Sequence, residues 1–327
     1  MADGLVPRPT AREETFLSVV LSFRNEESTL EALLAELRQA LDPLGVRCEF
    51  VFVNDASTDR SLEILLRQRE TDARVKIVNM SRRFGFYPCI MAGLASARGN
   101  AVVYMCTDLQ DPPDLIPRML EAFWDGAEVV NTVRTKRLGE SAFKMWVTRK
   151  AYQVINLLSD IDLPENMGDF KLLSRRVVDT LLRLPENDPY LRGIIRWVGF
   201  RQDSIPYQRL PRHSGRTHFP LLSAAPVQEF IRGVTSFSVA PLLLCLIYGL
   251  VVSLISLSWI GVIVVTKLMG INPPGFSAIM AATLFLNGNL LLTNGLIGLY
   301  IARIYNQVKD RPRYIIQGTV GLDDKDS

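Results

Sequence analysis

The chain has 327 residues, of which 48% are apolar, and a formal net charge of +3. This length allows one large domain and a further element, and the mild charge, without a long basic tract, argues against nucleic acid as a partner. The mean hydropathy of +0.15 is high for a purely soluble protein, so we expect a membrane-embedded part.

The N-terminal 14 residues are polar and charged and do not resemble a signal peptide, so we expect residues 1–15 to form a disordered tail. From residue 16, apolar strand-like runs alternate with amphipathic helical patterns. This alternation predicts an α/β fold with a mostly parallel sheet and ligands at the carboxyl ends of its strands. The expected strands are 16–23, 48–55, 75–80, 101–105 and 128–133, and the expected helices are 28–41, 57–71, 88–96 and 115–124.

Polar clusters follow the first two expected strands. The stretch SFRNEEST places Glu26 at the exit of the first strand, and VNDASTDRS places Asp55 and Asp59 after the second. Capping of the following helices by Ser, Thr and acidic residues explains part of this pattern. The alternative is a loop that holds a nucleoside, and two acidic strand ends in one sheet favour it.

The stretch YMCTDLQDPPDL ends the fourth expected strand in Thr107, Asp108 and Gln110 and is stopped by two prolines. A hard divalent cation prefers oxygen ligands, takes few of them from the protein and is often completed by substrate phosphates. Asp108 and the amide oxygen of Gln110 therefore fit a metal–diphosphate site at this strand end.

Two segments, 237–266 and 276–302, are nearly free of charge and exceed the roughly 20 apolar residues that cross a bilayer. Lys and Arg residues precede the first segment and follow the second. The positive-inside bias therefore predicts a hairpin of two transmembrane helices, with the large N-terminal part and the C-terminus in the cytosol. The four cysteines show no metal-ligand spacing and are expected to be free thiols.

Several motifs together resemble a known family. SFRNEES, VNDASTDRS, MSRRFGFYPCIMAG, DLQDPPDLIPRML, GDFKLLSRR, the two apolar segments and the tail GLYIARIYNQVKDRPRYII follow one another in the order and spacing of the membrane-bound polyprenyl-phosphate glycosyltransferases of family 2. This group has a Rossmann-like GT-A domain and includes the dolichyl-phosphate mannose synthases and bacterial undecaprenyl-phosphate glycosyltransferases. The resemblance covers nearly the whole chain.

The resemblance implies transfer of a sugar from a nucleotide sugar, most simply a UDP-sugar, to a polyprenyl phosphate such as undecaprenyl phosphate, with inversion. It implies Mg²⁺ or Mn²⁺ as cofactor, held by Asp108 and Gln110, and a reacting phosphate faced by Asp169. The donor-binding residues that it implies are Ser22, Arg24, Glu26, Asp55, Asp59, Arg82 and Thr107. The acceptor-binding residues that it implies are Lys171, Arg192, Arg212, Arg216 and His218.

The chain departs from the family pattern at two places. Cys106 stands where an Asp-x-Asp motif would begin, and a neutral thiol is a poor ligand for a hard cation, so we exclude it from the metal site. The usual Gly-x-Ser-Lys motif reads Gly215, Arg216, Thr217 and His218. The cation that Lys normally supplies would come from Arg212 or Arg216.

We therefore expect a GT-A catalytic domain over 16–219, which includes an amphipathic juxtamembrane helix at about 139–158. A second juxtamembrane helix at 220–235, the membrane segment 236–302 and a cytosolic tail 303–327 with a short strand follow. We expect Trp197 to pack in the core. The tail strand has an exposed edge that would pair with another chain or with its own sheet. This edge and the family resemblance predict a homo-oligomer, a tetramer by resemblance.

Two other functions remain open. A catalytically silent nucleotide-sugar-binding scaffold would explain Cys106 and the altered Lys motif. A processive polysaccharide synthase would need a channel, for which two helices per chain are too few unless oligomers build it. The favoured hypothesis is the polyprenyl-phosphate glycosyltransferase. It would act at the inner membrane in cell-envelope glycan or lipopolysaccharide modification.

Overall fold

The computed structural model describes residues 11–136, 167–187, 190–209, 238, 240–270 and 275–322. The α/β domain begins with a short turn of 3-10 helix and continues with alternating strands and helices. Its elements are η1 (Arg12–Glu14), β1 (Phe16–Phe23), α1 (Leu30–Leu41), η2 (Asp42–Leu44), β2 (Arg47–Asn54), α2 (Ser61–Thr71), β3 (Val75–Met80), α3 (Phe86–Ser96), β4 (Ala101–Cys106), η3 (Pro113–Leu115), α4 (Ile116–Trp124), β5 (Val129–Lys136), β6 (Met167–Ser174), α6 (Arg175–Arg183), α7 (Leu191–Trp197) and β7 (Gln202–Gln208).

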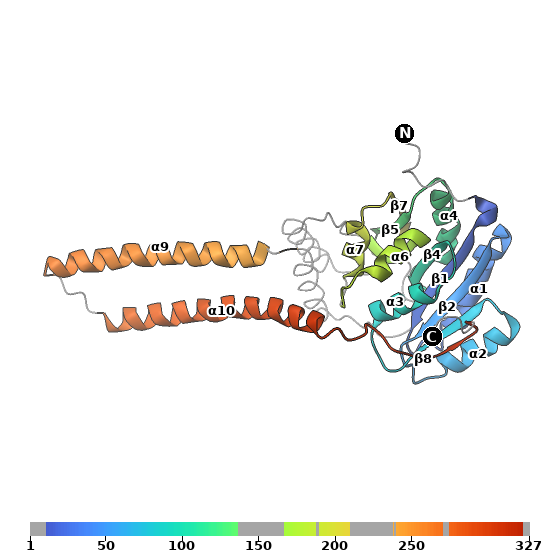
Figure 1. Cartoon of the computed structure of the whole chain (residues 1–327), viewed down its shortest axis with the longest axis horizontal. Helices are drawn as coiled ribbons and strands as arrows, with labels where there is room; N and C mark the ends of the chain where they lie inside the picture. Colours follow the sequence, from blue (N-terminus) through green and yellow to red (C-terminus); the bar gives the residue numbers. More distant parts are fainter. Residues whose placement is uncertain are drawn as a thin grey trace.

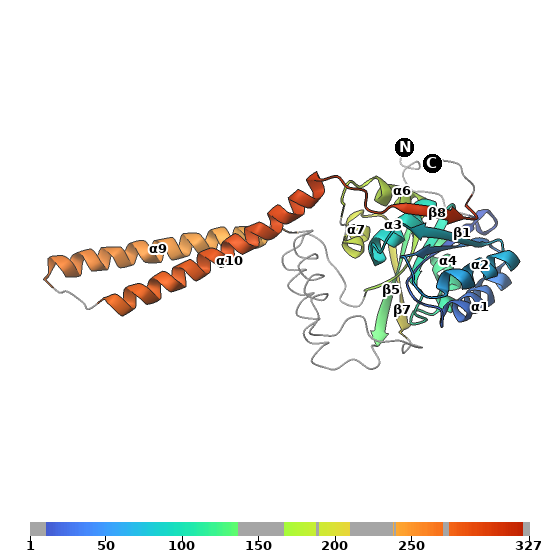
Figure 2. The ribbon, with the colours of Figure 1, turned by 90° about the horizontal axis from the view of Figure 1, so that it is seen from below.

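The chain ends in two long helices and a short strand. These are α9 (Ala240–Leu268), α10 (Phe276–Val308) and β8 (Ile316–Val320). Figures 1 and 2 show α9 and α10 extending side by side away from the α/β domain, whereas the segment after α10 returns to the domain to form β8.

The described strands form one mixed sheet in the order β7-β5-β6-β4-β1-β2-β3-β8. β1 pairs in parallel with both β2 and β4, β2 pairs in parallel with β3, and β5 pairs in parallel with β7. β6 is antiparallel to its neighbours β4 and β5, and β8 is antiparallel to β3. The expected GT-A, mostly parallel sheet is thus confirmed, and the carboxyl ends of β1, β2, β3 and β4 meet at one edge.

Helices cover both faces of the sheet, because the central strands are apolar on both sides. One buried cluster joins β1, β2 and β4 to α1 and α4, and the other joins the opposite face to α3, α6 and α7. The central strand β1 (FLSVVLSF) illustrates the alternation: Val19 belongs to the first cluster and Val20 to the second.

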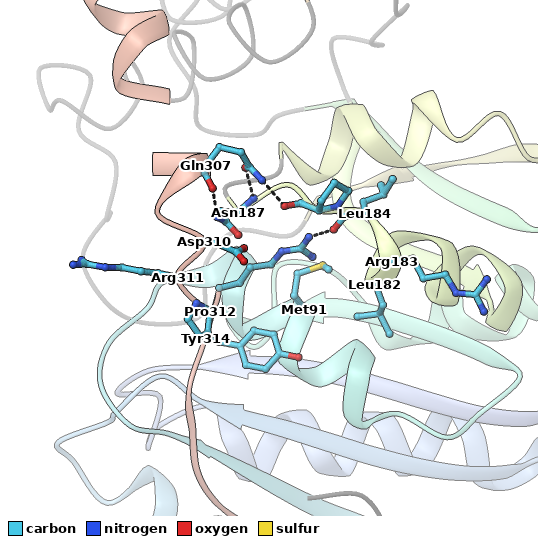
Figure 3. Close-up of a pocket in the computed structure, with 12 residues that line it drawn as sticks. Met91, Leu182, Arg183, Leu184, Asn187, Gln307, Asp310, Arg311, Pro312 and Tyr314 are labelled. Carbon is cyan, nitrogen blue, oxygen red and sulfur yellow. Dashed lines mark hydrogen bonds between the residues drawn. The ribbon is translucent and has the colours of Figure 1, made fainter. Parts of the chain in front are cut away.

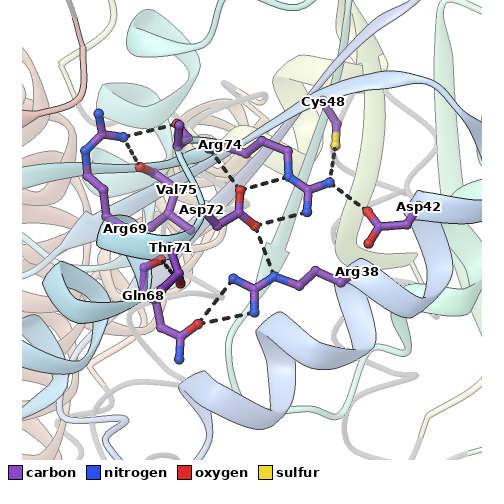
Figure 4. Close-up of polar contacts among 10 residues, drawn as sticks. Arg38, Asp42, Cys48, Gln68, Arg69, Thr71, Asp72, Arg74 and Val75 are labelled. Carbon is purple, nitrogen blue, oxygen red and sulfur yellow. Dashed lines mark hydrogen bonds and ion pairs between the residues drawn. The ribbon is translucent and has the colours of Figure 1, made fainter.

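A polar network closes the opposite, amino-terminal edge of the sheet (Figure 4). Asp72 accepts hydrogen bonds from Arg74 and Arg38, and Arg74 also forms an ion pair with Asp42 at 2.7 Å. These contacts tie the ends of α1 and α2 to the start of β3. The network lies away from the carboxyl edge and has a structural role.

α9 and the stretch Phe285–Val308 of α10 are long and apolar enough to cross a membrane, and neither is buried within the described structure. Tyr300 of α10 donates a hydrogen bond to the carbonyl of Ser238 at 2.8 Å, which ties the two helices together at the domain side. The expected second apolar segment ended at about 302. α10 continues beyond it to Val308, through last turns that contain polar residues.

Three details differ from the sequence-based expectation. Residues 11–15, assigned to the tail, are ordered, and Thr15 is buried and accepts a hydrogen bond from Trp124 Nε1. Trp197, the last residue of α7, is 61% exposed rather than in the core. The expected juxtamembrane helices at 139–158 and 220–235 lie outside the described residues.

Candidate active site

Four parallel strands direct their following loops to one edge of the sheet. The strand ends are Phe23, Asn54, Met80 and Cys106. Asn25, Ala56 and Leu109 in these loops have left-handed backbone angles (φ of 55°, 53° and 56°). Non-glycine residues with positive φ are uncommon and concentrate where surrounding contacts force a tight turn. The candidate site is therefore built on constrained loops.

The β1–α1 and β2–α2 loops are locked together by hydrogen bonds. Arg24 donates through Nη1 to the carbonyls of Asp55 and Ala56, at 2.7 and 3.0 Å. Asp55 is 5% exposed, and its carboxylate accepts from the backbone N–H groups of Phe84 and Gly85. Asp55, in the β2–α2 loop, therefore contacts both the β1–α1 loop and the β3–α3 loop. Its carboxylate orders the β3–α3 loop just before α3 begins.

The acidic residues of the first two loops are likewise hydrogen-bonded. Glu26 accepts from the Thr29 hydroxyl at 3.1 Å, and its N–H donates to Ser61 Oγ. Asp59 accepts from the N–H groups of Ser61 and Glu27. Burial opposes ionisation of Asp59, but these hydrogen bonds outweigh it and lower its pKa. Helix capping and ligand binding are compatible here, because Glu26 and Asp59 remain partly exposed.

The turn after β4 carries the residues expected to bind a metal. Asp108 accepts a hydrogen bond from the N–H of Gln110 at 3.2 Å, and its other oxygen lies 3.8 Å from Arg209 Nη2. Thr107 is buried and donates to the carbonyl of Ser22 at 3.3 Å. Asp108 itself is partly exposed, with a side-chain exposure of 16%. The turn is thus anchored to β1 while the Asp108 carboxylate remains accessible.

Cys106 marks the point where the carboxylates converge. Desolvation, followed by the charges of Asp108, Asp111 and Asp169, raises its pKa well above the usual value. A thiol with such a pKa is neutral near pH 7 and does not serve as a thiolate ligand. β4 and β6 are antiparallel with Tyr104 opposite Lys171, and this register brings Asp169 of β6 to the end of β4 where the turn begins.

Asp169 forms a bidentate ion pair with Arg192 of α7. Arg192 Nε donates to one carboxylate oxygen at 2.6 Å, and Nη2 donates to the other. Burial alone would raise the pKa of Asp169, but the charge and hydrogen bonds of Arg192 outweigh it and lower the pKa. The paired fork of an Arg and a carboxylate fixes both side chains. Asp169 is therefore ionised, and it orients Arg192.

Asp111 was missing from the sequence-based candidates, and the structure buries it completely beneath the Asp108 turn. Its Oδ1 accepts from the Tyr207 hydroxyl at 2.5 Å, and Arg134 Nε donates to the same hydroxyl at 3.1 Å. Its Oδ2 has no hydrogen-bond partner among the described residues. Burial raises the pKa of Asp111. The motif DLQDPP contained this residue, but nothing in the sequence paired it with Tyr207.

Lys171 needs a correction. It was expected to contact the acceptor phosphate, but it is fully buried, and its Nζ donates to Asn131 Oδ1 at 2.6 Å. Burial lowers its pKa to about 7. β6 places Asp169 and Lys171 on the same face, and only Asp169 lies at the open end. A direct contact between Lys171 and a phosphate does not fit this structure.

The remaining candidates are placed as follows. Arg82 is exposed on the β3–α3 loop, with its guanidinium 4.0 Å from the ring centre of Phe84. Ser22 is half-buried at the end of β1, where its hydroxyl contacts Cys89. Arg212, Arg216 and His218 lie outside the described residues.

A divalent metal fits the chemistry of this edge, although the protein alone does not supply a complete set of ligands. No cluster of three or more His, Cys, Asp or Glu side chains suited to a metal occurs within the described part of the chain. The partly exposed Asp108 carboxylate is a suitable oxygen ligand, and a diphosphate can supply others. The residues therefore fit a metal shared with a substrate, with Asp108 as one protein ligand.

Comparison with known proteins identifies the class. The model of the family "Glycosyl transferase family 2" matches residues 18–182. An uncharacterised glycosyltransferase of Bacillus subtilis, YkcC, is 40% identical over 94% of this chain and 95% of its own length. The bactoprenol glucosyl transferase derived from prophage SfII in Shigella flexneri is 34% identical over 92% of this chain and 97% of its own.

Among solved structures, glucosyl-3-phosphoglycerate synthase from Mycobacterium tuberculosis is similar over 68% of this chain and 79% of its own, with 18% identity and a TM-score of 0.49. The family match and the full-length relatives define a glycosyltransferase. The chain belongs to glycosyl transferase family 2.

Proposed function

We propose that this glycosyltransferase moves a monosaccharide from a UDP-sugar to the phosphate of a membrane polyprenyl phosphate, such as undecaprenyl phosphate, with inversion. The observation that supports the proposal is the position of Asp108 and of the Asp169–Arg192 ion pair at the same end of the neighbouring strands β4 and β6. In this proposal Asp108 would bind a metal and Arg192 a phosphate. The name of the Shigella relative, a bactoprenol glucosyl transferase, supports a lipid acceptor.

The donor would lie against the loops after β1, β2 and β4. In this proposal Arg24, Glu26, Asp55 and Asp59 surround the nucleoside directly or by ordering its loops. Ser22, Arg82 and Thr107 contribute from the neighbouring strand ends. Asp108, with Gln110, would hold Mg²⁺ or Mn²⁺, and the bound metal would neutralise charge on the leaving diphosphate.

The acceptor phosphate would be bound by Arg192, with Arg212, Arg216 and His218 completing its surroundings. A phosphate monoester has a second pKa of about 6, so near pH 7 it is already mostly a dianion. It can attack the anomeric carbon without losing a proton to a base. Asp169 therefore acts by fixing Arg192 in place, since an in-line attack depends steeply on orientation.

The two apolar helices support an integral membrane location, with the catalytic domain and the C-terminus in the cytoplasm. A polyprenyl phosphate carries its phosphate at the membrane surface, within reach of a domain tethered there. We also propose a homotetramer, which rests on the family resemblance. Of the two pairings expected for the tail strand, β8 makes the one with its own sheet, at β3.

The proposal is tested with the full-length protein in detergent, undecaprenyl phosphate and a panel of radiolabelled uridine and guanosine sugar nucleotides. We expect transfer of label to the lipid with one UDP-sugar and with Mg²⁺ or Mn²⁺. The second candidate, a silent nucleotide-sugar-binding scaffold, is favoured by the neutral Cys106 at the expected first Asp. It predicts donor binding without labelled lipid for every donor.

A further inference from the structure

The end of α10 is hydrogen-bonded to the connection between α6 and α7, although the two segments are 120 residues apart in sequence (Figure 3). The side chain of Gln307 makes two of the contacts. Its Oε1 accepts from the N–H of Asn187 at 2.9 Å, and its Nε2 donates to the carbonyl of Pro185 at 2.6 Å. A single amide side chain therefore satisfies the backbone of the connection on both sides.

The contacts are reciprocal. Asn187 Nδ2 lies within hydrogen-bond distance of the carbonyls of Gln307, at 3.3 Å, and Asn306, at 3.5 Å. Beyond α10, the guanidinium of Arg313 donates to the carbonyl of Leu184. We call the contacts of Leu184, Pro185, Asn187, Gln307 and Arg313 the α10 junction.

Hydrogen bonds, rather than packed apolar side chains, form most of the α10 junction. An open cavity of about 570 Å³ lies beside it, with Met91, Leu182 and Tyr314 in its wall (Figure 3). Space that remains open supplies few dispersion contacts. Removing the amide of Gln307 should therefore loosen the junction without leaving a hole in the apolar core.

The chain that leaves α10 is also fixed at a second point. The N–H of Ser81 donates to the carbonyl of Ile315 at 2.9 Å, and β8 then pairs with β3 from Ile316 to Val320. β3 leads directly to the loop that contacts the carboxylate of Asp55. The chain at and after the end of α10 is thus bound to the α/β domain at two places.

We propose that the α10 junction sets the position of the active site relative to the bilayer, so that a phosphate carried by a membrane lipid reaches Arg192. The inference rests on the proposed function. The apolar part of α10 is followed by Arg303, Asn306 and Gln307 in the last turns of the helix, so Gln307 lies just beyond the point where the helix leaves the membrane. The connection that Gln307 binds leads into α7, which carries Arg192. Gln307 is accordingly a positioning residue.

The test compares two acceptors. Full-length wild type, Gln307→Met and the control Asn306→Ala are assayed with undecaprenyl phosphate in vesicles and with a short water-soluble polyprenyl phosphate in detergent. Met keeps the length of Gln307 without its amide, and Ala at residue 306 keeps the backbone carbonyl that Asn187 contacts. We expect Gln307→Met to lose about 5- to 30-fold in transfer to the vesicle-bound acceptor, the order of two lost hydrogen bonds.

The same variant should keep its rate with the short acceptor and its KM for the sugar nucleotide, and Asn306→Ala should match wild type throughout. An equal loss with both acceptors, or no loss in vesicles, would overturn the inference.

Amide hydrogen exchange provides a readout that needs no activity. Exchange at Asn187 should accelerate in Gln307→Met while the amides of β6 stay protected, and unchanged exchange at Asn187 would also overturn it.

The two proposals fail in distinguishable ways. If wild type transfers no sugar to either lipid, the proposed function is wrong, and the exchange experiment still decides whether Gln307 holds the connection between α6 and α7.

Discussion

Asp169 shows how an ion pair limits what a carboxylate can do. Its bidentate ion pair with Arg192 lowers its pKa despite burial. In this state the carboxylate is ionised at neutral pH but is already occupied by the guanidinium. Orientation of Arg192 toward the acceptor phosphate is the role that this geometry favours, and a general base is not required.

The two roles predict different pH profiles for Asp169→Asn. If Asp169 orients Arg192, the variant should be slow at every pH, because an amide cannot hold the guanidinium with two charge-assisted hydrogen bonds. If it were a base, the rate should recover above about pH 7.5, where the phosphate is fully dianionic. The measurement is the transfer rate between pH 6 and 9, relative to wild type. Recovery at high pH would contradict the positioning role.

Tyr207 is a second residue whose role the structure makes testable. Its hydroxyl donates to Asp111 beneath the turn that carries Asp108. We expect Tyr207→Phe to weaken Mn²⁺ binding in the presence of UDP by about 3- to 10-fold, because a lost hydrogen bond to a buried carboxyl leaves that group unsatisfied and loosens the turn. Calorimetric titration with Mn²⁺ measures this.

Tyr104 is the matched control for that experiment. It is also fully buried, but its hydroxyl has no hydrogen-bond partner in the described residues. Tyr104→Phe should therefore leave Mn²⁺ affinity unchanged. Equal affinity of Tyr207→Phe and wild type would show that Asp111 does not support the Asp108 turn.

At the level of elements, the sequence was sufficient to predict the strands and helices of the first half of the domain. The expected strands at 16–23 and 75–80 have the bounds of β1 and β3, because their apolar runs are bounded by clear turn signals. β6 was not expected as a strand, although its motif GDFK was recognised. It inserts between β4 and β5 in an antiparallel sense, and such long-range pairing leaves no local signal.

β7 illustrates a second limit of the sequence. Its residues QDSIPYQ are polar and contain a proline, a combination that is tolerated at a sheet edge. This edge strand carries Tyr207. Because the sequence did not predict the strand, it also did not predict that Tyr207 binds Asp111. Asp108, Gln110, Asp169 and Arg192 could be selected from motifs, whereas the burial of Lys171 and the role of Asp111 required the packed structure.

The network at the amino-terminal edge leads to a stability prediction (Figure 4). Partial burial would raise the pKa of Asp72, but hydrogen bonds from Arg74 and Arg38 outweigh it and lower the pKa to about 2. A depressed folded-state pKa contributes stability above the unfolded value near 4, and this contribution is lost as the pH falls toward 2. Asp72→Asn should therefore cost about 1–2 kcal/mol at pH 7 after solvent screening.

Urea unfolding of the full chain in detergent measures this cost at several pH values. The difference between wild type and Asp72→Asn should shrink between pH 4 and pH 2, and Glu36→Gln on the exposed face of α1 should show no comparable difference. A cost that is independent of pH would mean that packing, and not the charge of Asp72, is responsible.

At the scale of the whole molecule, the chain joins a glycosyltransferase domain to two long apolar helices. α9 and α10 expose large apolar side chains along their length, including Leu246, Trp259 and Leu291. Surfaces of this kind require a membrane or a partner to cover them. The sequence predicted both helices from hydropathy, but it did not reveal the α10 junction, which connects residues 120 positions apart.

The most direct test of the account is the formation of a sugar-linked lipid by the purified full-length protein. UDP-glucose, undecaprenyl phosphate and Mg²⁺ or Mn²⁺ are incubated with wild type or Asp108→Asn, and the lipid product is measured by mass spectrometry. We expect wild type to form undecaprenyl phosphate carrying one hexose, or the corresponding product with another UDP-sugar. Asp108→Asn should reduce this by about 100-fold or more, since metal-assisted charge stabilisation supplies several kcal/mol. Absence of any glycolipid with wild type across the UDP-sugars, or full activity of Asp108→Asn, would contradict the account.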